Sequence, residues 1–579
     1  MNPPHTPPKS SARLLWAGLL LVIAGVLLAH FVQTAGGVRI QDVRFTGTNG
    51  TPMSAHLYVP PNATAKTPAP GVLAVHGYFN SREAQSGFAI EFARRGYVVL
   101  ALDQTGHGYS APPAFANAFG GIDGLKYLRS LDIVDKDNIG LEGHSMGGWA
   151  VVNAAAAMPD AYKALVLEGS STGKPFAPEG TPEFPRNLAV VFSRYDEFPG
   201  IMWNVPTAAE VSNSKKLQSV FATDAPVEPG RVYGSLEAGT ARVLYTPAIT
   251  HPMDHISPTA IGHAVDWFQR TLKGGSPKPA GDQVWYWKEA GTLLALIGLA
   301  VFVLGTIDVL LRVPAFSSLR SPASAPAAGP ATRGARWWTA LLFGAVVPAL
   351  SFLPLCRLGG VLLPASPWLP QLFSNEIAFW ALGNALIVLV AARLTRAPGA
   401  SLGPLVTQPL RALSFAATVF VLAYALVATV QFVFNLDVRI WFIALKPMSR
   451  WQAGAFPVYL VAFAVYFVIT LRVLHAIITP AVAGAAGQYL AAFAALGGGF
   501  VAFLCLQYGL MLSTHRMLEF HMFDALRTII SINFVPLLAF VAAVSTFAWR
   551  RTGNYLPGAL VSAAFVAWYV VVGQATQAP

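Results

Sequence analysis

Long apolar stretches separated by short polar segments fill the second half of the chain and recur once near its beginning. A helix crosses the roughly 30 Å apolar core of a bilayer with about 20 apolar residues. By that measure, about nine stretches predict membrane-spanning helices, at residues 14–32, 290–311, 337–355, 376–392, 412–434, 456–478, 488–512, 528–549 and 556–574. The pattern therefore divides the chain into an N-terminal anchor (1–37), a domain with ordinary polarity (38–280) and a polytopic helical domain (286–579).

Short apolar runs alternate with helix-like periodicity between residues 38 and 280. The apolar runs predict strands at 72–76, 97–102, 138–142, 164–167, 188–192 and 242–245. The periodic segments predict helices at 84–95, 120–129, 145–158 and 258–272. Alternation of this kind is typical of an α/β fold, in which helices cover a mostly parallel sheet.

Composition supports the division. Hydrophobic residues make up 54% of the chain and charged residues only 12%, whereas soluble domains carry about 25% charged residues. The net charge of +11 does not indicate a nucleic-acid partner, because many basic residues stand singly or in pairs beside apolar stretches. Both cysteines, Cys356 and Cys505, lie in the helical half, so the α/β domain contains no disulfide.

The basic residues also predict an orientation. Lys9 and Arg13 precede the first stretch, and placing them in the cytoplasm puts residues 38–280 outside. If successive spans then cross the membrane in alternating directions, further arginines also lie in the cytoplasm, namely Arg312, Arg320, Arg333, Arg336, Arg393, Arg396, Arg411, Arg550 and Arg551. We therefore expect a multi-pass protein of the plasma membrane with an extracytoplasmic α/β domain.

Several segments leave alternatives open. The first stretch also fits a cleaved signal peptide, although its apolar length favours an anchor. Residues 313–334, rich in Pro, Ala, Ser and Gly, predict a flexible loop. Basic residues on the expected outer side predict short interfacial helices there, and they are Arg439, Lys446, Arg450, Arg516 and Arg527. His515 and Glu519 would share one helix face, as an interfacial helix or a metal or proton site.

One motif carries the chemistry. Gly143-His144-Ser145-Met146-Gly147 follows the predicted strand 138–142 and precedes an alanine-rich helix. A tight strand-to-helix turn strains its central residue, and small residues two positions away let the backbone pass. Ser145 is therefore predicted to present its hydroxyl above the sheet edge as a nucleophile.

Residues 135–148 resemble the nucleophile-elbow region of the α/β-hydrolase superfamily, particularly its dienelactone-hydrolase and prolyl-oligopeptidase-like branches. His76-Gly77 is similar to the oxyanion loop of that family, and residues 103–110 resemble the loop after its next strand. The resemblance covers about residues 38–275 and does not reach the helical half. It implies the α/β-hydrolase fold and a Ser-His-acid triad.

The remaining site residues follow from their positions. The backbone N–H groups of Tyr78 and Met146 are expected to form the oxyanion hole. Asp196, after strand 188–192, is the expected acid, with Glu168 as the alternative and Glu197 as a solvated neighbour.

The base is expected after the last strand. His251 is favoured because it lies on the turn, with His255 as the alternative. His76 and His144 precede or adjoin Ser145, contrary to the usual chain order, so both are expected to be structural. Asp254, between His251 and His255, is interpreted as part of a polar turn, and no metal or cofactor is expected.

These features predict a membrane-bound serine hydrolase that cleaves carboxylic ester or related acyl bonds of a small-molecule or lipidic substrate, with the bilayer as its other partner. A serine peptidase, an envelope acyltransferase and a non-catalytic binding module of a transporter or receptor remain alternatives. The short segment 172–185, where a lid would stand, predicts a fairly open site.

Overall fold

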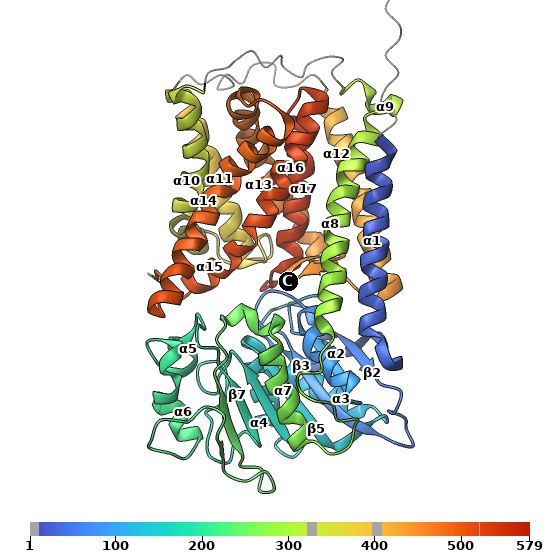
Figure 1. The fold of residues 1–579 in the computed structure, drawn as a ribbon, viewed down its shortest axis with the longest axis vertical. Coiled ribbons are helices and arrows are strands. Elements are labelled where there is room, and N and C mark those ends of the chain that lie inside the picture. Colours follow the sequence, from blue (N-terminus) through green and yellow to red (C-terminus); the bar gives the residue numbers. More distant parts are fainter. Residues whose placement is uncertain (1–10, 321–332, 396–407, 520, 579) are drawn as a thin grey trace, which may run out of the picture.

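The computed structural model describes residues 11–320, 333–395, 408–519 and 521–578. It has two parts, a sheet flanked by helices and a bundle of long helices that stands on one edge of that layered domain (Figure 1). The C-terminal end of the chain lies between the two parts (Figure 1). The functional site described below lies at this junction.

The sheet has nine strands in the order β1-β2-β4-β3-β5-β6-β7-β9-β8. Strands from β4 to β9 run parallel, while β1, β2 and β8 pair antiparallel with their neighbours. The bounds are β1 Arg39–Thr46, β2 Pro52–Val59, β3 Ala69–Val75, β4 Val98–Asp103, β5 Val134–His144, β6 Ala164–Glu168, β7 Leu188–Val191, β8 Val232–Tyr233 and β9 Arg242–Tyr245. All six predicted strands are present, and they form the parallel centre.

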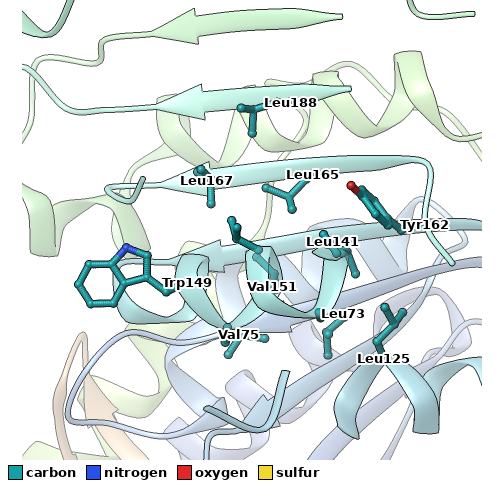
Figure 2. Packing of buried hydrophobic residues seen from close by; sticks show 14 of the residues in the cluster. Leu73, Val75, Leu125, Leu141, Trp149, Val151, Tyr162, Leu165, Leu167 and Leu188 are labelled. Atoms are coloured by element: carbon teal, nitrogen blue, oxygen red, sulfur yellow. The ribbon is translucent and has the colours of Figure 1, made fainter. Parts of the chain in front are cut away.

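Helices cover both faces of this sheet. α2 (Ser86–Arg94) and α7 (Pro258–Thr271) pack on one face, while α3 (Gly121–Ser130) and α4 (Met146–Ala157) pack on the other. Leu73 of β3 and Val151 of α4 belong to the buried hydrophobic cluster between the sheet and the second pair of helices, and Figure 2 shows part of this cluster. The predicted α/β fold with a mostly parallel, helix-covered sheet is confirmed.

Among the described residues, nine helical segments are long and apolar enough to cross a membrane. They coincide with the nine predicted stretches. Their helices are α1 Ser11–Gln33, α8 Trp285–Leu310, α10 Ala335–Leu362, α11 Leu372–Leu394, α12 Pro409–Phe434, α13 Arg450–Val473, α14 Ala485–Thr514, α15 Asp524–Ile532 with α16 Phe534–Thr552, and α17 Leu556–Gly573.

The first of these helices packs along α8 at glycines. A Cβ added at Gly18 would lie 2.3 Å from the backbone nitrogen of Phe302, and one added at Gly305 would lie 2.3 Å from that of Leu15. Small residues at such positions let two helix backbones approach closely within a membrane. α1 is therefore an integral part of the helical bundle.

Two predictions about the helical half are wrong. Residues 438–445 form a hairpin, β10 (Val438–Ile440) and β11 (Ile443–Leu445), where an interfacial helix was expected. Arg439 and Lys446 are buried at the junction and pair with acidic side chains, so neither needs an interfacial helix. Helix α14 ends at Thr514, so His515 and Glu519 do not share a helix face.

The predicted loop 313–334 is only partly described. Residues Pro314–Ser317 form the short helix α9 at the end of the bundle remote from the sheet (Figure 1). Residues 321–332 lie outside the described residues, as does Arg396.

Candidate active site

Ser145 occupies a strained turn between β5 and α4. Its φ of 53° and ψ of −122° lie outside the regions that residues with a Cβ prefer. Two hydrogen bonds hold the turn, since the backbone N–H of Ser145 donates to Glu168 O at 2.8 Å and Ser170 Oγ donates to Ser145 O at 2.6 Å. The surrounding structure thus fixes Ser145 in a conformation that costs free energy, as is common at functional sites.

The flanking glycines make this turn sterically possible. A Cβ at Gly143 would lie 2.3 Å from Gly147 O, and a Cβ at Gly147 would lie 2.0 Å from Val75 O. Both distances are far below van der Waals contact, so neither position accepts a side chain without movement of the backbone. The motif meets the steric requirement that its spacing predicted.

His251 and Asp196 meet from two loops at the same edge of the sheet. Asp196 follows β7, and His251 follows β9 and begins a 3₁₀ turn. His251 Nδ1 lies 2.7 Å from Asp196 Oδ2, while the other oxygen, Oδ1, accepts the N–H of Phe198 at 2.7 Å. The ring of Phe198 packs edge-on against His251, with 4.7 Å between centroids. The imidazole is therefore fixed in both tautomer and orientation.

The alternative residues have different surroundings. The ring of His255 packs on His144 with 4.0 Å between centroids. Glu168 is buried at the end of β6, and neither of its carboxylate oxygens has a hydrogen-bond partner. The structure thus pairs His251 with Asp196 and leaves the side chains of His255 and Glu168 outside that hydrogen bond.

His76 and His144 serve the backbone around the site. His76 Nδ1 lies 2.7 Å from Gly77 O, and His144 Nε2 lies 3.0 Å from His251 O. Each ring therefore braces a loop: His76 the loop that follows β3, and His144 the turn that carries His251.

The backbone N–H groups expected to bind an oxyanion flank Ser145. Met146 begins α4, so its N–H has no acceptor within the helix. Tyr78 lies on the loop after β3, and a Cβ at its neighbour Gly77 would be 3.0 Å from Ser145 Cβ. Tyr78 and Met146 line the same cavity as Ser145 and His251.

This cavity has a volume of about 820 Å³ and is enclosed by both parts of the chain. Ser145, His251 and aromatic residues of the α/β domain form one wall, while residues of α10, α11 and α15 form the other. The expectation of a fairly open site is wrong, because the helical bundle stands where a lid would be. The expectation came from the short segment 172–185 alone, whereas the helices that cover the cavity are distant in the sequence.

A chain of contacts links the helical bundle to His251 through Glu197. This residue is 4% exposed and accepts the backbone N–H of His251 through Oε2 at 2.8 Å. Its Oε1 accepts a hydrogen bond of 3.1 Å from the hydroxyl of Tyr508, on α14. The interpretation of Glu197 as a solvated charge is wrong, and no local pattern could have indicated a partner 311 residues away.

Burial determines the ionisation of the site. It lowers the pKa of His251 from 6.5 to about 4, against the opposing charge of Asp254. Burial also raises the pKa of Asp196 above its ordinary value, an effect that the hydrogen bond from Phe198 N–H counteracts. The imidazole of His251 is therefore neutral at pH 7 and free to accept a proton.

Three side chains lie close enough to ligate a metal. Ligand atoms of His144, His251 and Asp254 are within 4.8 Å of one another. His251 Nδ1 is engaged with Asp196, and Asp254 Oδ1 accepts a 2.5 Å hydrogen bond from Ser193 Oγ. These contacts favour a network that supports the histidines over a metal site.

Comparison with known proteins agrees with the fold. Residues 70–199 match the family model of the alpha/beta hydrolase fold. A 2-hydroxy-6-oxononadienedioate/2-hydroxy-6-oxononatrienedioate hydrolase from Cupriavidus pinatubonensis is 31% identical over 132 residues, which are 22% of this chain and 40% of that relative. A monoacylglycerol lipase from Mycolicibacterium smegmatis is 27% identical over 204 residues, 34% of this chain and 68% of the lipase.

Among solved structures, an esterase from Pyrobaculum calidifontis aligns with a TM-score of 0.29 and 17% identity, over 47% of this chain and 96% of its own. The matched region spans only 40% of the length of the Cupriavidus hydrolase. The family model lies wholly within the sheet domain, between β3 and the start of α5 (Pro199–Trp203). The chain therefore contains a domain with the α/β-hydrolase fold, joined to a bundle of long apolar helices.

Proposed function

We propose that this chain is a membrane-bound serine hydrolase that cleaves carboxylic ester or related acyl bonds. Ser145 is the nucleophile, His251 the general base and Asp196 the acid that orients His251. The observation that carries the proposal is the 2.7 Å contact of His251 Nδ1 with Asp196 Oδ2, in a cavity shared with the strained Ser145. No cofactor or metal takes part in the proposed reaction.

The reaction proceeds through an acyl-enzyme. Ser145 Oγ attacks the carbonyl carbon while His251 Nε2 takes its proton, and the N–H groups of Tyr78 and Met146 stabilise the oxyanion. The bond to the leaving alcohol then breaks, and His251 returns the proton to the departing oxygen. Water attacks the acyl-enzyme in the same way, which releases the acid and regenerates Ser145.

In the described part of the chain, no hydrogen bond links Ser145 Oγ to His251 or His255. Catalytic hydrogen bonds are often long before substrate binds and shorten in the Michaelis complex. The hydroxyl of Ser145 rotates about one bond, whereas His251 is fixed by Asp196, Glu197 and Phe198. Of the two groups, the serine hydroxyl is therefore the one with more freedom to move when substrate binds.

The helical bundle supports a location in a membrane, with 1–37 as an anchor, 38–280 as the catalytic domain and 286–579 as the polytopic domain. Helix α8 leads from the α/β domain to α9 at the opposite end of the bundle (Figure 1). Arg312 follows α8 at that opposite end, and cytoplasmic loops are enriched in such residues. We place the catalytic domain on the extracytoplasmic face of the plasma membrane.

The cavity favours acyl chemistry over peptide cleavage. Its walls near Ser145 consist largely of apolar side chains, including Phe115, Trp149, Phe176 and Phe198. A bound peptide backbone needs hydrogen-bond partners that such walls lack, whereas an acyl chain needs none. An envelope acyltransferase would use the same residues and differs only in the acceptor that replaces water.

Labelling with a fluorophosphonate tests the proposal, because this reagent reacts preferentially with an activated serine. Purified wild-type protein should be labelled, Ser145→Ala should not, and His251→Ala should label at least 100-fold more slowly. Ser130→Ala, an exposed serine at the end of α3, is the matched control and should label normally. Unlabelled wild type, or labelled Ser145→Ala, would refute the proposed function and favour a binding module.

A further inference from the structure

We propose that the substrate is a long-chain acyl ester with an uncharged polar headgroup, and that it enters the cavity from the bilayer between α10 and the segment before α15. This inference rests on the proposed hydrolase activity of Ser145. It concerns the helical wall of the cavity, which the catalytic mechanism does not use.

The helical wall is apolar over most of its extent. Leu372 and Phe373 of α11 face the cavity together with Leu526 and Ile529 of the span that begins with α15. On the opposite wall, Trp149 stacks on Phe176 with 4.1 Å between ring centroids. A cavity of about 820 Å³ lies in the upper part of the range for ligand pockets, roughly 300–1,000 Å³. Its size and lining suit a long hydrocarbon chain.

The cavity reaches the surface at apolar side chains. Val361, near the end of α10, lines it and is 77% exposed, and Met522, just before α15, lines it and is 61% exposed. Neighbouring exposed residues extend this rim along both segments, namely Leu358, Leu362, Leu518 and Phe523. Exposed apolar surface on this scale marks a site of contact with lipid or another ligand.

The position of the rim indicates which medium it meets. Helix α15 lies at the end of the bundle next to the α/β domain (Figure 1). The last turn of α10 lines the same cavity as α15, so the C-terminal end of α10 also lies near the α/β domain. Trp368, in the loop that follows α10, is 84% exposed, and tryptophan is enriched at membrane interfaces. The rim therefore opens where the acyl chains of the nearest leaflet meet their headgroups.

The charges in the helical wall balance one another. Arg527 donates to both oxygens of Glu376 at 2.7 and 2.8 Å, and Arg357 and Arg527 both pair with Asp524. Among the described residues of this wall, two guanidinium groups thus face two carboxylates, and these ion pairs leave no net positive charge for a phosphate. This balance favours an uncharged headgroup over an anionic one.

The experiment uses full-length protein in phosphatidylcholine nanodiscs and measures the fatty acid released from three probes. They are 1-palmitoylglycerol, 1-butyrylglycerol and the anionic 1-palmitoyl lysophosphatidylglycerol. We expect kcat/KM for 1-palmitoylglycerol to exceed that for each of the other two at least 10-fold. Val361→Trp, which fills the rim, should lower the palmitoyl-to-butyryl ratio of kcat/KM at least 10-fold.

Leu350→Trp is the matched control. Leu350 lies on α10 eleven residues before Val361, on roughly the same helix face about 16 Å away, and is 74% exposed outside the cavity. It should leave the ratio unchanged. Preference for the butyryl ester, or an equal fall of the ratio in both variants, overturns lateral entry, and preference for the anionic lipid overturns the uncharged headgroup. Each of these outcomes still requires Ser145-dependent hydrolysis, whereas failure of the proposed function removes hydrolysis of all three probes.

Discussion

The link between Tyr508 and Glu197 makes catalysis dependent on a helix of the bundle. Tyr508→Phe removes the hydroxyl that donates to Glu197 Oε1 at 3.1 Å and changes little else in the shape of α14. Glu197 then holds the backbone N–H of His251 without its second partner. His515, which follows α14, stacks on Tyr195 with 5.1 Å between ring centroids. Tyr195 is the residue before Asp196, and this contact is retained in the variant.

The magnitude follows from the cost of an unsatisfied buried acceptor, which is about 1–3 kcal/mol. If roughly half of that cost is transmitted to the position of His251, the barrier rises by about 0.5–1.5 kcal/mol, a roughly 2- to 10-fold fall in kcat. Because Tyr508 does not line the cavity, KM should stay within about 2-fold of the wild-type value, since uniform binding is unchanged.

The assay compares kcat and KM for p-nitrophenyl butyrate in wild type, Tyr508→Phe and Tyr489→Phe. Tyr489 lies on the same helix, nineteen residues away toward the other end and outside the cavity, so it controls for loss of a tyrosine hydroxyl from α14. Only Tyr508→Phe should lower kcat. Unchanged kcat in a folded Tyr508→Phe protein, or an equal fall in Tyr489→Phe, would show that this helix does not position His251.

Two further outcomes follow from the electrostatics. His251 must be neutral to accept the proton of Ser145. Because the pKa of His251 is about 4, kcat/KM should rise with pH through about 4 and level off near neutrality. A pH–rate profile whose acid limb lies at 6.5 or above would contradict this expectation. Burial alone would raise the pKa of Glu83, but the positive charges of Lys446, 3.0 Å away, and Arg82 outweigh burial and hold this pKa below 4.5. The stabilisation of the fold by this ion pair is therefore present at neutral pH and is lost as pH falls through the lowered pKa. Lys446→Met should therefore cost about 3 kcal/mol of unfolding free energy at pH 7.5. The Tm difference from wild type should shrink as the pH is lowered below 4 toward the lowered pKa of Glu83, whereas a difference that stays equal over this range would refute the assignment.

Local sequence was most informative where local sterics decide the structure. The glycines at 143 and 147 are required by contacts within a few residues of Ser145 and with the adjacent strand, so the motif could be read from spacing. The nine apolar stretches were equally predictable from the sequence, because the thickness of the bilayer fixes the length of a spanning helix. Edge strand β1 was not predicted, since five of its eight residues are exposed and its pattern resembles that of a polar loop.

Which of several distant side chains pair with one another was harder to predict from the sequence. Asp196 was preferred to Glu168 by its position after strand 188–192, and His251 to His255 by its position on the turn after the last strand. Neither position states which carboxylate an imidazole meets. Glu197 illustrates the limit: beside Asp196 it reads as a surface charge, yet it is buried because α14 covers it.

The sequence by itself determined the α/β domain, the turn at Ser145 and the number of apolar helices, since periodicity, turn sterics and bilayer thickness act over short stretches of chain. Only the tertiary structure decided that Asp196 holds His251, that Lys446 neutralises Glu83, and that α10, α11 and α15 close the cavity over Ser145. These contacts join residues tens to hundreds of positions apart, and the free energy that selects them comes from burial and charge pairing across the junction, which no local pattern records.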